Sequence, residues 1–274
     1  MNDATSFWNA LSPYMDFLEN VLGINLDNLS PILPLIESPV LVVGAGQGLL
    51  VEGLRQRGFS TEGIDLSPQM IEYAEKRRGI KLFLANANSM PFEKSQFKTS
   101  IVATGVIDFL NDSGQIGAIL NEVRRVTEAR GEIFVALIGA TRQSEELLRY
   151  IGFLSDNQLS PKLIGQVLMR PENPVKQIIA LIRKDPNKSI PGLVFRWVRA
   201  FISMPGRISK RIKSGRALMK KVRAGEIPSL EVLLNSLPER MFIRSGDQIR
   251  ELFAGLNFPP QRIMEFDNCK IARL

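Results

Sequence analysis

A glycine-rich turn occupies residues 44–48 (GAGQG), between an apolar run at residues 39–43 and a helical pattern that begins near Gly48. Glycines let the backbone turn sharply and let a ligand approach where a Cβ would collide with it. Free N–H groups at the start of the following helix favour a bound carboxylate or phosphate. Asp65 follows Gly44 by 21 residues, the distance at which an acid accepts hydrogen bonds from ribose hydroxyls. Together these residues predict a site for a cofactor that carries a ribose.

Two other interpretations of the turn stay open at this point. Dinucleotide sites prefer G-x-G-x-x-G, whereas position 49 here is leucine and the third glycine comes one residue early. The spacing therefore argues against NAD. Alternatively, the turn is a tight connection between a strand and a helix that holds no ligand, and the position of Asp65 is then a coincidence.

Short apolar runs alternate with helical patterns over the first half of the chain, which is typical of βαβ units and a parallel sheet. We expect strands at residues 40–43, 59–64, 80–84, 99–103 and 132–138. Helices are expected at about 48–57, from Pro68 to Gly79 with Ser67 as N-cap, and at 113–127. A helix at 246–254 and strands at 261–267 and 269–274 complete the pattern. The predicted fold is α/β, with a doubly wound, seven-stranded and mostly parallel sheet.

Positive charge is concentrated in one part of the chain. Residues 155–225 hold 16 lysines and arginines and three acids, a net charge of +13, so the remainder must carry −6 of the total +7. The same region has apolar residues at helical spacing and irregularly placed prolines. We therefore predict a core at residues 1–140 and 243–274, of which 1–30 form a helical cap, and a largely helical, basic insertion at 141–242.

The composition excludes several kinds of chemistry. The chain has no histidine, which removes imidazole bases, Ser-His-Asp triads and histidine metal sites. Cys269 is the single cysteine, so no disulfide within the chain and no metal site are expected. The N-terminus lacks a basic segment before an apolar stretch, and no apolar run is long enough to span a membrane. These features predict a cytoplasmic protein.

Residues 40–138 resemble the core of class I S-adenosylmethionine-dependent methyltransferases, in particular the branch that methylates small molecules and quinones. The resemblance rests on five segments in the family's order: VLVVGAGQG, GIDLSPQMIEYAEKR, LANANSMPFEKSQF, SIVATGVIDFL and LNEVRRVTEARGEIFVAL. The N-terminal segment FWNALSPYMDFLENVLG resembles the family's leading aromatic helix. The family resemblance implies S-adenosylmethionine as the cofactor and methyl transfer to a small acceptor.

The resemblance also implies a role for each matching position. The methionine part of the cofactor would be lined by Gly44, Ala45, Gly46 and Gly48, and its ribose would be held by Asp65. Around the adenine would lie Leu66, Met70, Asn86 and Ala87. Thr104 and Val106 would face the methyl end, and Tyr14 would cap the cofactor. An equally good interpretation of Tyr14 is that it belongs to the apolar face of a helix.

Two positions depart from the family. Val42 replaces the acid that usually lies two residues before the turn, and Asn86 replaces the usual aspartate. Both changes remove negative charge from the surroundings of a cationic cofactor, although an asparagine carbonyl can still accept a hydrogen bond. A methyltransferase-like scaffold without catalytic activity is therefore an alternative to an enzyme.

Asp108 is the candidate catalytic residue, because it follows the fourth strand where the family often carries a histidine. It would take a proton from the acceptor or orient it. A loop carboxylate without a catalytic role is an equally good interpretation. Asp112, four residues later, has the position of a helix N-cap.

The insertion is expected to determine the substrate, since segments inserted after the fifth strand form a lid in this family. Its apolar residues Ile208, Ile212, Met219 and Val222 are flanked by lysines and arginines over residues 207–223. This pattern fits a lid helix that packs on the core, or a basic amphipathic helix in peripheral contact with an anionic membrane and a lipophilic substrate. An RNA or protein methyltransferase that binds through the basic insertion is the other alternative, and no recognisable RNA-binding module supports it.

Overall fold

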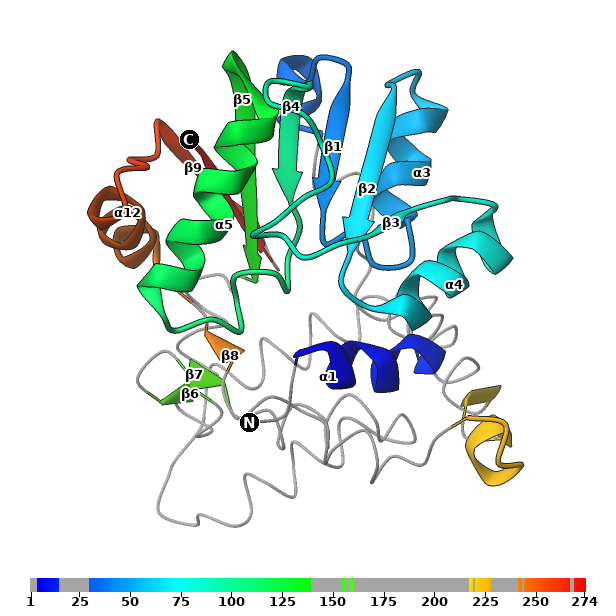
Figure 1. Cartoon of the computed structure of the whole chain (residues 1–274). Helices are drawn as coiled ribbons and strands as arrows, with labels where there is room; N and C mark the ends of the chain where they lie inside the picture. The colour runs from blue at the N-terminus through cyan, green and yellow to red at the C-terminus, as the bar shows by residue number, and fades with distance from the viewer. Residues whose placement is uncertain are drawn as a thin grey trace, which may run out of the picture.

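The computed structural model describes residues 4–14, 30–138, 154–155, 158–159, 217–218, 220–227, 241–242, 244–266 and 269–274. Its centre is a seven-stranded sheet in the order β3-β2-β1-β4-β5-β10-β9. The strands span Val40–Val43 (β1), Thr61–Asp65 (β2), Phe83–Leu84 (β3), Phe97–Val102 (β4), Thr127–Ile138 (β5), Arg262–Glu265 (β9) and Cys269–Arg273 (β10). Only β10 runs against its neighbours in this sheet. The predicted doubly wound, mostly parallel sheet is confirmed (Figure 1).

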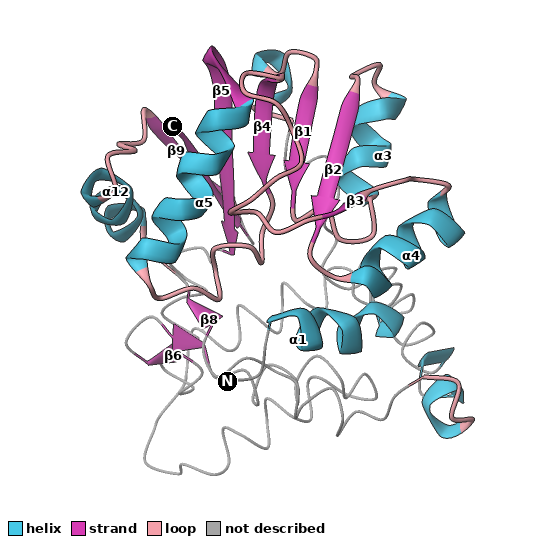
Figure 2. Cartoon of the chain, viewed as in Figure 1, coloured by secondary structure: helices cyan, strands magenta, loops and turns pink. Residues whose placement is uncertain are grey.

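Helices cover both faces of the sheet (Figure 2). They span Ala4–Leu11 (α1), Leu49–Gln56 (α3), Pro68–Arg78 (α4), Ser113–Val126 (α5) and Gly246–Gly255 (α12), with short 3₁₀ helices at Ser12–Tyr14 (η1) and Leu33–Leu35 (η3). Apolar side chains of α5 and α12 share one core cluster with the sheet, and those of α3 share the other. In Figure 1, α1 crosses below the carboxyl ends of the parallel strands.

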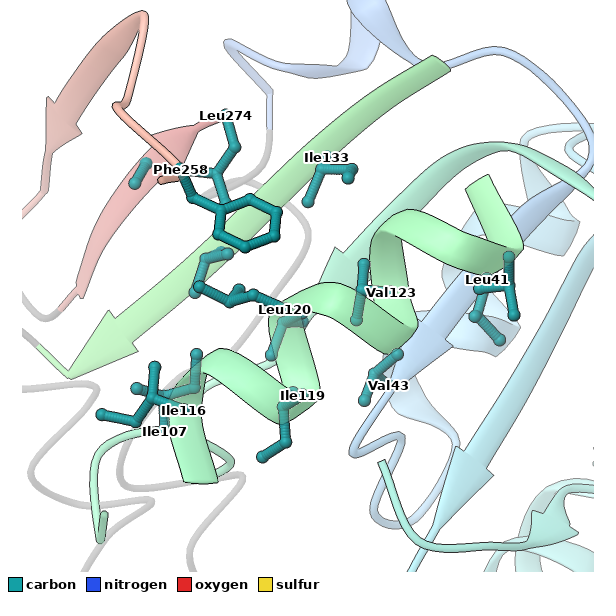
Figure 3. Packing of buried hydrophobic residues seen from close by; sticks show 14 of the residues in the cluster. Leu41, Val43, Ile107, Ile116, Ile119, Leu120, Val123, Ile133, Phe258 and Leu274 are labelled. Carbon is teal, nitrogen blue, oxygen red and sulfur yellow. The ribbon is translucent and has the colours of Figure 1, made fainter. Parts of the chain in front are cut away.

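The central strand β1 is buried on both faces, as its all-apolar sequence predicts. Leu41 and Val43 belong to the cluster that contains α5, whereas Val40 and Val42 belong to the cluster that contains α3. Figure 3 shows Leu41 and Val43 beside Val123 of α5. Burial of each such side chain contributes about 1.5–3 kcal/mol. This two-sided packing fixes the strand from which the glycine-rich turn departs.

The helix ends follow the predicted capping residues. Ser67 caps α4, with its hydroxyl accepting a hydrogen bond from the N–H of Met70, and Pro68 occupies the first turn. Asp112 caps α5 by accepting from the N–H of Gly114. Gly79 ends α4 with a left-handed φ of 66°. The predicted N-cap roles of Ser67 and Asp112 are therefore confirmed.

The bounds of β3 and β5 differ most from expectation. β5 begins at Thr127 rather than at Glu132, because the chain stays extended through an irregularity in its pairing with β4. At Gly131 an added Cβ would lie 2.6 Å from the carbonyl oxygen of Lys98, so the glycine allows close strand contact rather than forming a turn. β3 comprises two residues instead of the expected five, and both lie exposed at the sheet edge.

Most of the predicted helical insertion at residues 141–242, including most of its basic segment at 207–223, lies outside the described residues. The parts that are described include a small sheet formed by Leu154–Ser155 (β6), Gln158–Leu159 (β7) and Met241–Phe242 (β8). Its pairings join the beginning of the insertion to its end. The sequence pattern did not predict these strands. Within the described part of the chain, no helix has the length and apolar character needed to cross a membrane.

Candidate functional site

The order of the strands identifies one edge of the sheet as the place for a ligand. The chain passes from β1 outward to β2 and β3, and then returns to β4 on the other side of β1. The loops after the adjacent strands β1 and β4 therefore run in opposite directions from the carboxyl ends of these strands. Open α/β sheets bind ligands at such a point. The glycine-rich turn, Asp65 and residues 104–108 all follow strands that end at this edge. The fold thus brings the predicted site residues together.

Asp65 holds the glycine-rich turn against the end of β2. Its Oδ2 accepts a hydrogen bond from the N–H of Gly46 at 2.7 Å, and its Oδ1 accepts from the N–H of Ser67 at 2.8 Å. The N–H groups of Gly44 and Ala45 donate to the carbonyl of Ile64. Gly44, Gly46 and Gly48 all have positive φ values, between 54° and 77°, so the path of the turn requires glycine at these positions.

The Asp65 carboxylate keeps the capacity to bind hydroxyl groups. A carboxylate offers about four lone-pair sites, and the two backbone hydrogen bonds use one on each oxygen. Burial raises the pKa of Asp65, whereas hydrogen bonds from the N–H groups of Ser67, Gly46 and Leu66 oppose this shift. The predicted binding of a ribose by Asp65 stays a prediction.

Two features of the turn fit a cofactor. A Cβ added at Gly46 would meet no atom within 4 Å, so this side of the turn is open. Gln47 is 3% exposed, and both polar atoms of its side chain are buried without a hydrogen-bond partner among the described residues. An unpaired buried amide costs about 1–3 kcal/mol, which makes Gln47 a candidate for contact with a ligand. Sequence reasoning did not single out Gln47, although it is the only side chain in the turn that can hydrogen-bond.

The residues predicted for the adenine lie along the ends of β2 and β3. Leu66 is 38% exposed, and so is available to a flat apolar ligand, whereas Met70 is 1% exposed within α4. The side-chain oxygen of Asn86 accepts a long hydrogen bond of 3.3 Å from the N–H of Asn88. Ala87 packs at the border of the core. The predicted contacts of these four residues with adenine stay predictions.

The loop after β4 lies against the glycine-rich turn. Val106 packs so closely on Gly44 that a Cβ at position 44 would overlap Cγ2 of the valine. Thr104 precedes this contact and is partly exposed. Gly105 lies under Trp8 of α1, because a Cβ at Gly105 would come within 2.7 Å of the indole ring. The loop therefore sits between the turn and α1, where the resemblance places the methyl end of the cofactor.

The helix α1 connects the two sides of this edge. Asn9 accepts a hydrogen bond of 2.6 Å from the hydroxyl of Ser67, and Trp8 contacts Gly105. Rings of Phe7, Trp8 and Phe109 pack against one another with centroid distances of 4.9–5.6 Å. Sequence reasoning noted the aromatic residues of α1, but their partners after β2 and β4 only emerge from the tertiary structure.

Tyr14 is 1% exposed and belongs to an apolar cluster that also contains Phe7, Leu11, Met70 and Leu218. Burial raises the pKa of its hydroxyl. This environment favours the interpretation of Tyr14 as part of the apolar face of the N-terminal segment. Its predicted role as a cap on the cofactor stays a prediction.

Asp108 is fully buried and holds three segments together. Its Oδ2 accepts from the N–H of Gly105 at 2.6 Å, its Oδ1 from the N–H of Ile138 at 2.7 Å, and its carbonyl from the N–H of Phe242 at 2.8 Å. These contacts fit a residue that positions the loop after β4. Its predicted part in proton transfer stays a prediction, and the side-chain contacts do not support it.

The electrostatics of Asp108 reflect its burial. Loss of solvent raises its pKa to about 6, against the opposing effects of two backbone hydrogen bonds and the nearby charge of Arg244. Arg244 donates to the carbonyl of Leu110 at 2.7 Å, which ties the end of the insertion to the same loop. Burial, together with the charge of Asp108, raises the pKa of the Cys269 thiol to about 11, so this cysteine is a poor nucleophile.

The chain is similar to known methyltransferases. Residues 40–131 match the family described as "Methyltransferase domain", from β1 into β5. No curated protein sequence matches the chain. Solved structures that are similar to it share low sequence identity with it. A protein from Pyrococcus horikoshii shares 17% identity over 90% of this chain and 87% of that one, with a TM-score of 0.49.

Two further structures are described as S-adenosylmethionine-dependent methyltransferases. The protein from Methanosarcina mazei shares 13% identity over 85% of this chain and 89% of that one, with a TM-score of 0.49. The protein from Thermotoga maritima, described as a possible histamine N-methyltransferase, shares 20% identity over 48% of this chain and 61% of that one, with a TM-score of 0.41.

Substitution of Gly44 tests the contact between the turn and the loop after β4. We expect Gly44→Ala to destabilise the protein by more than Gly58→Ala, because both positions have positive φ but only Gly44 would place its Cβ on Val106. The left-handed conformation alone costs about 1–2 kcal/mol, and overpacking adds about 1–3 kcal/mol. Urea unfolding of the two variants and the wild type measures the difference. Equal losses of stability would contradict this contact.

The buried carboxylate of Asp108 should make stability depend on pH. Its pKa of about 6 in the folded protein lies above the ordinary value of 3.8, which applies to the unfolded chain. As the pH falls, Asp108 is therefore protonated in the folded protein at a higher pH than in the unfolded chain. The resulting stabilisation is complete below pH 4 and is lost as the pH rises through 6. Relative to Asp108→Asn, the wild type should therefore gain about 1 kcal/mol of unfolding free energy between pH 7.5 and pH 5. A constant difference in urea unfolding over this range would contradict the raised pKa.

Proposed function

We propose that the chain is a class I S-adenosylmethionine-dependent methyltransferase and that it methylates a small, lipophilic acceptor beneath α1 and the segment inserted after β5. The observation that carries the choice of acceptor is the aromatic wall formed by Phe7, Trp8 and Phe109. This wall lies on Gly105, beside the loop that carries Thr104 and Val106. An acceptor bound there would meet aromatic rings on one side and the cofactor's methyl end on the other.

When bound, S-adenosylmethionine supplies an activated methyl group. The protein must then orient the acceptor and exclude water, which are sources of rate acceleration that need no strong base. Asp65 would hold the ribose, and the turn that it anchors would hold the amino-acid end. Asp108 fixes the loop after β4 through Gly105 and Ile138. Since the chain contains no histidine, a proton leaving the acceptor would pass to a carboxylate or to water.

The described part of the insertion supports a lid. Leu218, Val222 and Ile227 pack against the cluster formed by Phe7, Tyr14 and their neighbours. The basic residues Lys220, Lys221 and Arg223 of the same segment are exposed. The packing of Leu218, Val222 and Ile227 on this cluster supports the lid. Ile208, Ile212 and Met219 of the predicted stripe lie outside the described residues. The exposed charges would still allow peripheral contact with an anionic membrane surface.

Cofactor binding tests the first half of the proposal. Calorimetric titration should show that the wild type binds S-adenosylmethionine and S-adenosylhomocysteine, and that Asp65→Ala weakens binding at least tenfold. Asp65→Ala removes both the predicted ribose acceptor and the hydrogen bonds to Gly46 and Ser67. Asp247→Ala is the matched control, because it removes a carboxylate whose side chain is 90% exposed on α12. Its affinity should equal that of the wild type.

Gly46→Val is a second test of the same site, since a branched side chain would fill the open side of the turn. Folding of each variant is checked by thermal unfolding. Absence of binding by the folded wild type at millimolar ligand would overturn the proposal and would favour the scaffold alternative.

Substitution of Trp8 in the aromatic wall tests the proposed acceptor-binding site. With a panel of lipophilic phenols, quinols and amines and radiolabelled cofactor, we expect Trp8→Ala to raise the KM for the acceptor about tenfold or more. Trp8→Phe should recover much of the loss, because it keeps an aromatic surface near Gly105. Transfer of label to total RNA or protein, with no transfer to any small molecule, would contradict the proposed acceptor class.

A further inference from the structure

The described part of the insertion at 217–227 lies, with α1, beyond the carboxyl ends of the parallel strands (Figure 1). Leu218 and Val222 are one helical turn apart and so share a face of this segment. Together with Ile227 they pack on the apolar cluster of α1 and η1. This contact holds one face of the segment on the protein and leaves its charged side chains directed away from the core.

Three exposed cations lie in this segment. They are Lys220, Lys221 and Arg223, and neither lysine forms an ion pair or a hydrogen bond within the described part of the chain. In the sequence, residues 207–223 hold eight lysines and arginines and no acid. Single surface charges are usually solvated, whereas a stretch with about four to eight cations is attracted to anionic surfaces.

The remainder of the molecule has the opposite charge. Residues 155–225 carry a net charge of +13, and the rest of the chain carries −6. An anionic surface therefore attracts the insertion and repels the remainder. Since the segment at 217–227 packs on α1, beside the proposed acceptor site, this attraction orients that site toward the surface.

We propose that the segment at 217–227 docks on the anionic headgroups of a lipid bilayer and holds the proposed acceptor site against the membrane surface. The inference rests on the proposed function, because a lipophilic acceptor partitions into a bilayer. Leu218 and Val222 are engaged with the core, so the contact with lipid is made by the charged side chains and is peripheral.

RNA is the alternative polyanion for such a surface. Proteins that bind single-stranded nucleic acid combine positive charge with aromatic side chains on which the bases stack. Residues 217–227 include no aromatic residue. Phe7 and Trp8, which belong to the same apolar cluster, pack against each other and against Phe109. These observations favour the bilayer as the partner.

Vesicle binding tests the docking surface on the full-length protein, without cofactor or acceptor. Sedimentation compares vesicles of phosphatidylcholine with vesicles of equal parts phosphatidylcholine and phosphatidylglycerol. We expect the wild type to bind the anionic vesicles and not the neutral ones. The double variant Lys220→Gln/Lys221→Gln should bind them about tenfold or more weakly, because each basic residue near an anionic surface adds to the attraction. Raising the salt concentration from about 0.1 M to about 1 M shortens the screening length from about 10 Å to about 3 Å and should abolish binding.

Two matched variants separate a local contact from an effect of net charge. Lys81→Gln/Lys94→Gln removes the same charge from two exposed lysines that precede β3 and β4, at the opposite ends of the parallel strands. This variant should bind anionic vesicles within about twofold of the wild type, because its charges lie far from the docked surface. Lys220→Arg/Lys221→Arg keeps the charge and should also bind like the wild type. Thermal unfolding checks that each variant is folded.

Three results would overturn the inference. They are absence of wild-type binding to anionic vesicles, unchanged binding by Lys220→Gln/Lys221→Gln, and an equal loss of binding in Lys81→Gln/Lys94→Gln. Retention of total RNA in preference to anionic vesicles would also overturn it, and would assign the surface to nucleic acid.

The outcomes also separate the inference from the function on which it rests. A wild type that binds S-adenosylmethionine and methylates a dissolved acceptor, but does not bind anionic vesicles, overturns the inference alone. A wild type that binds anionic vesicles through Lys220 and Lys221, but does not bind S-adenosylmethionine, overturns the proposed function and supports the docking surface.

Discussion

The cofactor edge of the sheet depends on the two hydrogen bonds that the Asp65 carboxylate accepts from the backbone of Gly46 and Ser67. A run of left-handed glycines has few side chains with which to stabilise itself, so its path must be imposed from outside. Asp65 supplies this constraint from the end of β2, and it also fixes the first residues before α4. The carboxylate is buried, yet it is satisfied by backbone donors that cannot move independently of the strands. These hydrogen bonds also fix the orientation of the carboxylate that is predicted to bind the ribose.

A second buried carboxylate constrains the other side of the edge. Asp108 joins the loop after β4 to the end of β5 and to Phe242, where the chain returns from the insertion. Arg244 adds a contact between this returning segment and Leu110. The insertion is therefore anchored at the loop that lies beside the predicted methyl end of the cofactor. A change in the insertion can be transmitted to that loop through these contacts, which gives a physical route by which the insertion could affect the acceptor side.

The N-terminal helix α1 covers the gap between these two carboxylates. Asn9 contacts Ser67 on one side and Trp8 contacts Gly105 on the other. Apolar residues of α1 and of the segment at 217–227 pack into one cluster above the sheet edge. The resulting cover suits a reaction that needs alignment and a dry site more than it needs an acid or base.

The sequence by itself determined the sheet, the glycine-rich turn, the caps at Ser67 and Asp112, and the pairing of the turn with Asp65. These features are local, because they depend on periodicity, on backbone conformations that only glycine adopts easily, and on short-range spacing. Contacts between distant segments were decided only by the tertiary structure. The strand order decides which loops lie close together. It thereby determines the contact of Trp8 with Gly105, the burial of Asp108 and the unpaired amide of Gln47. Asp108 shows what the sequence could not decide. A carboxylate after β4 looks the same in the sequence whether it contacts an acceptor or fixes a loop through hydrogen bonds. Only its hydrogen-bond partners in the tertiary structure distinguish the two roles.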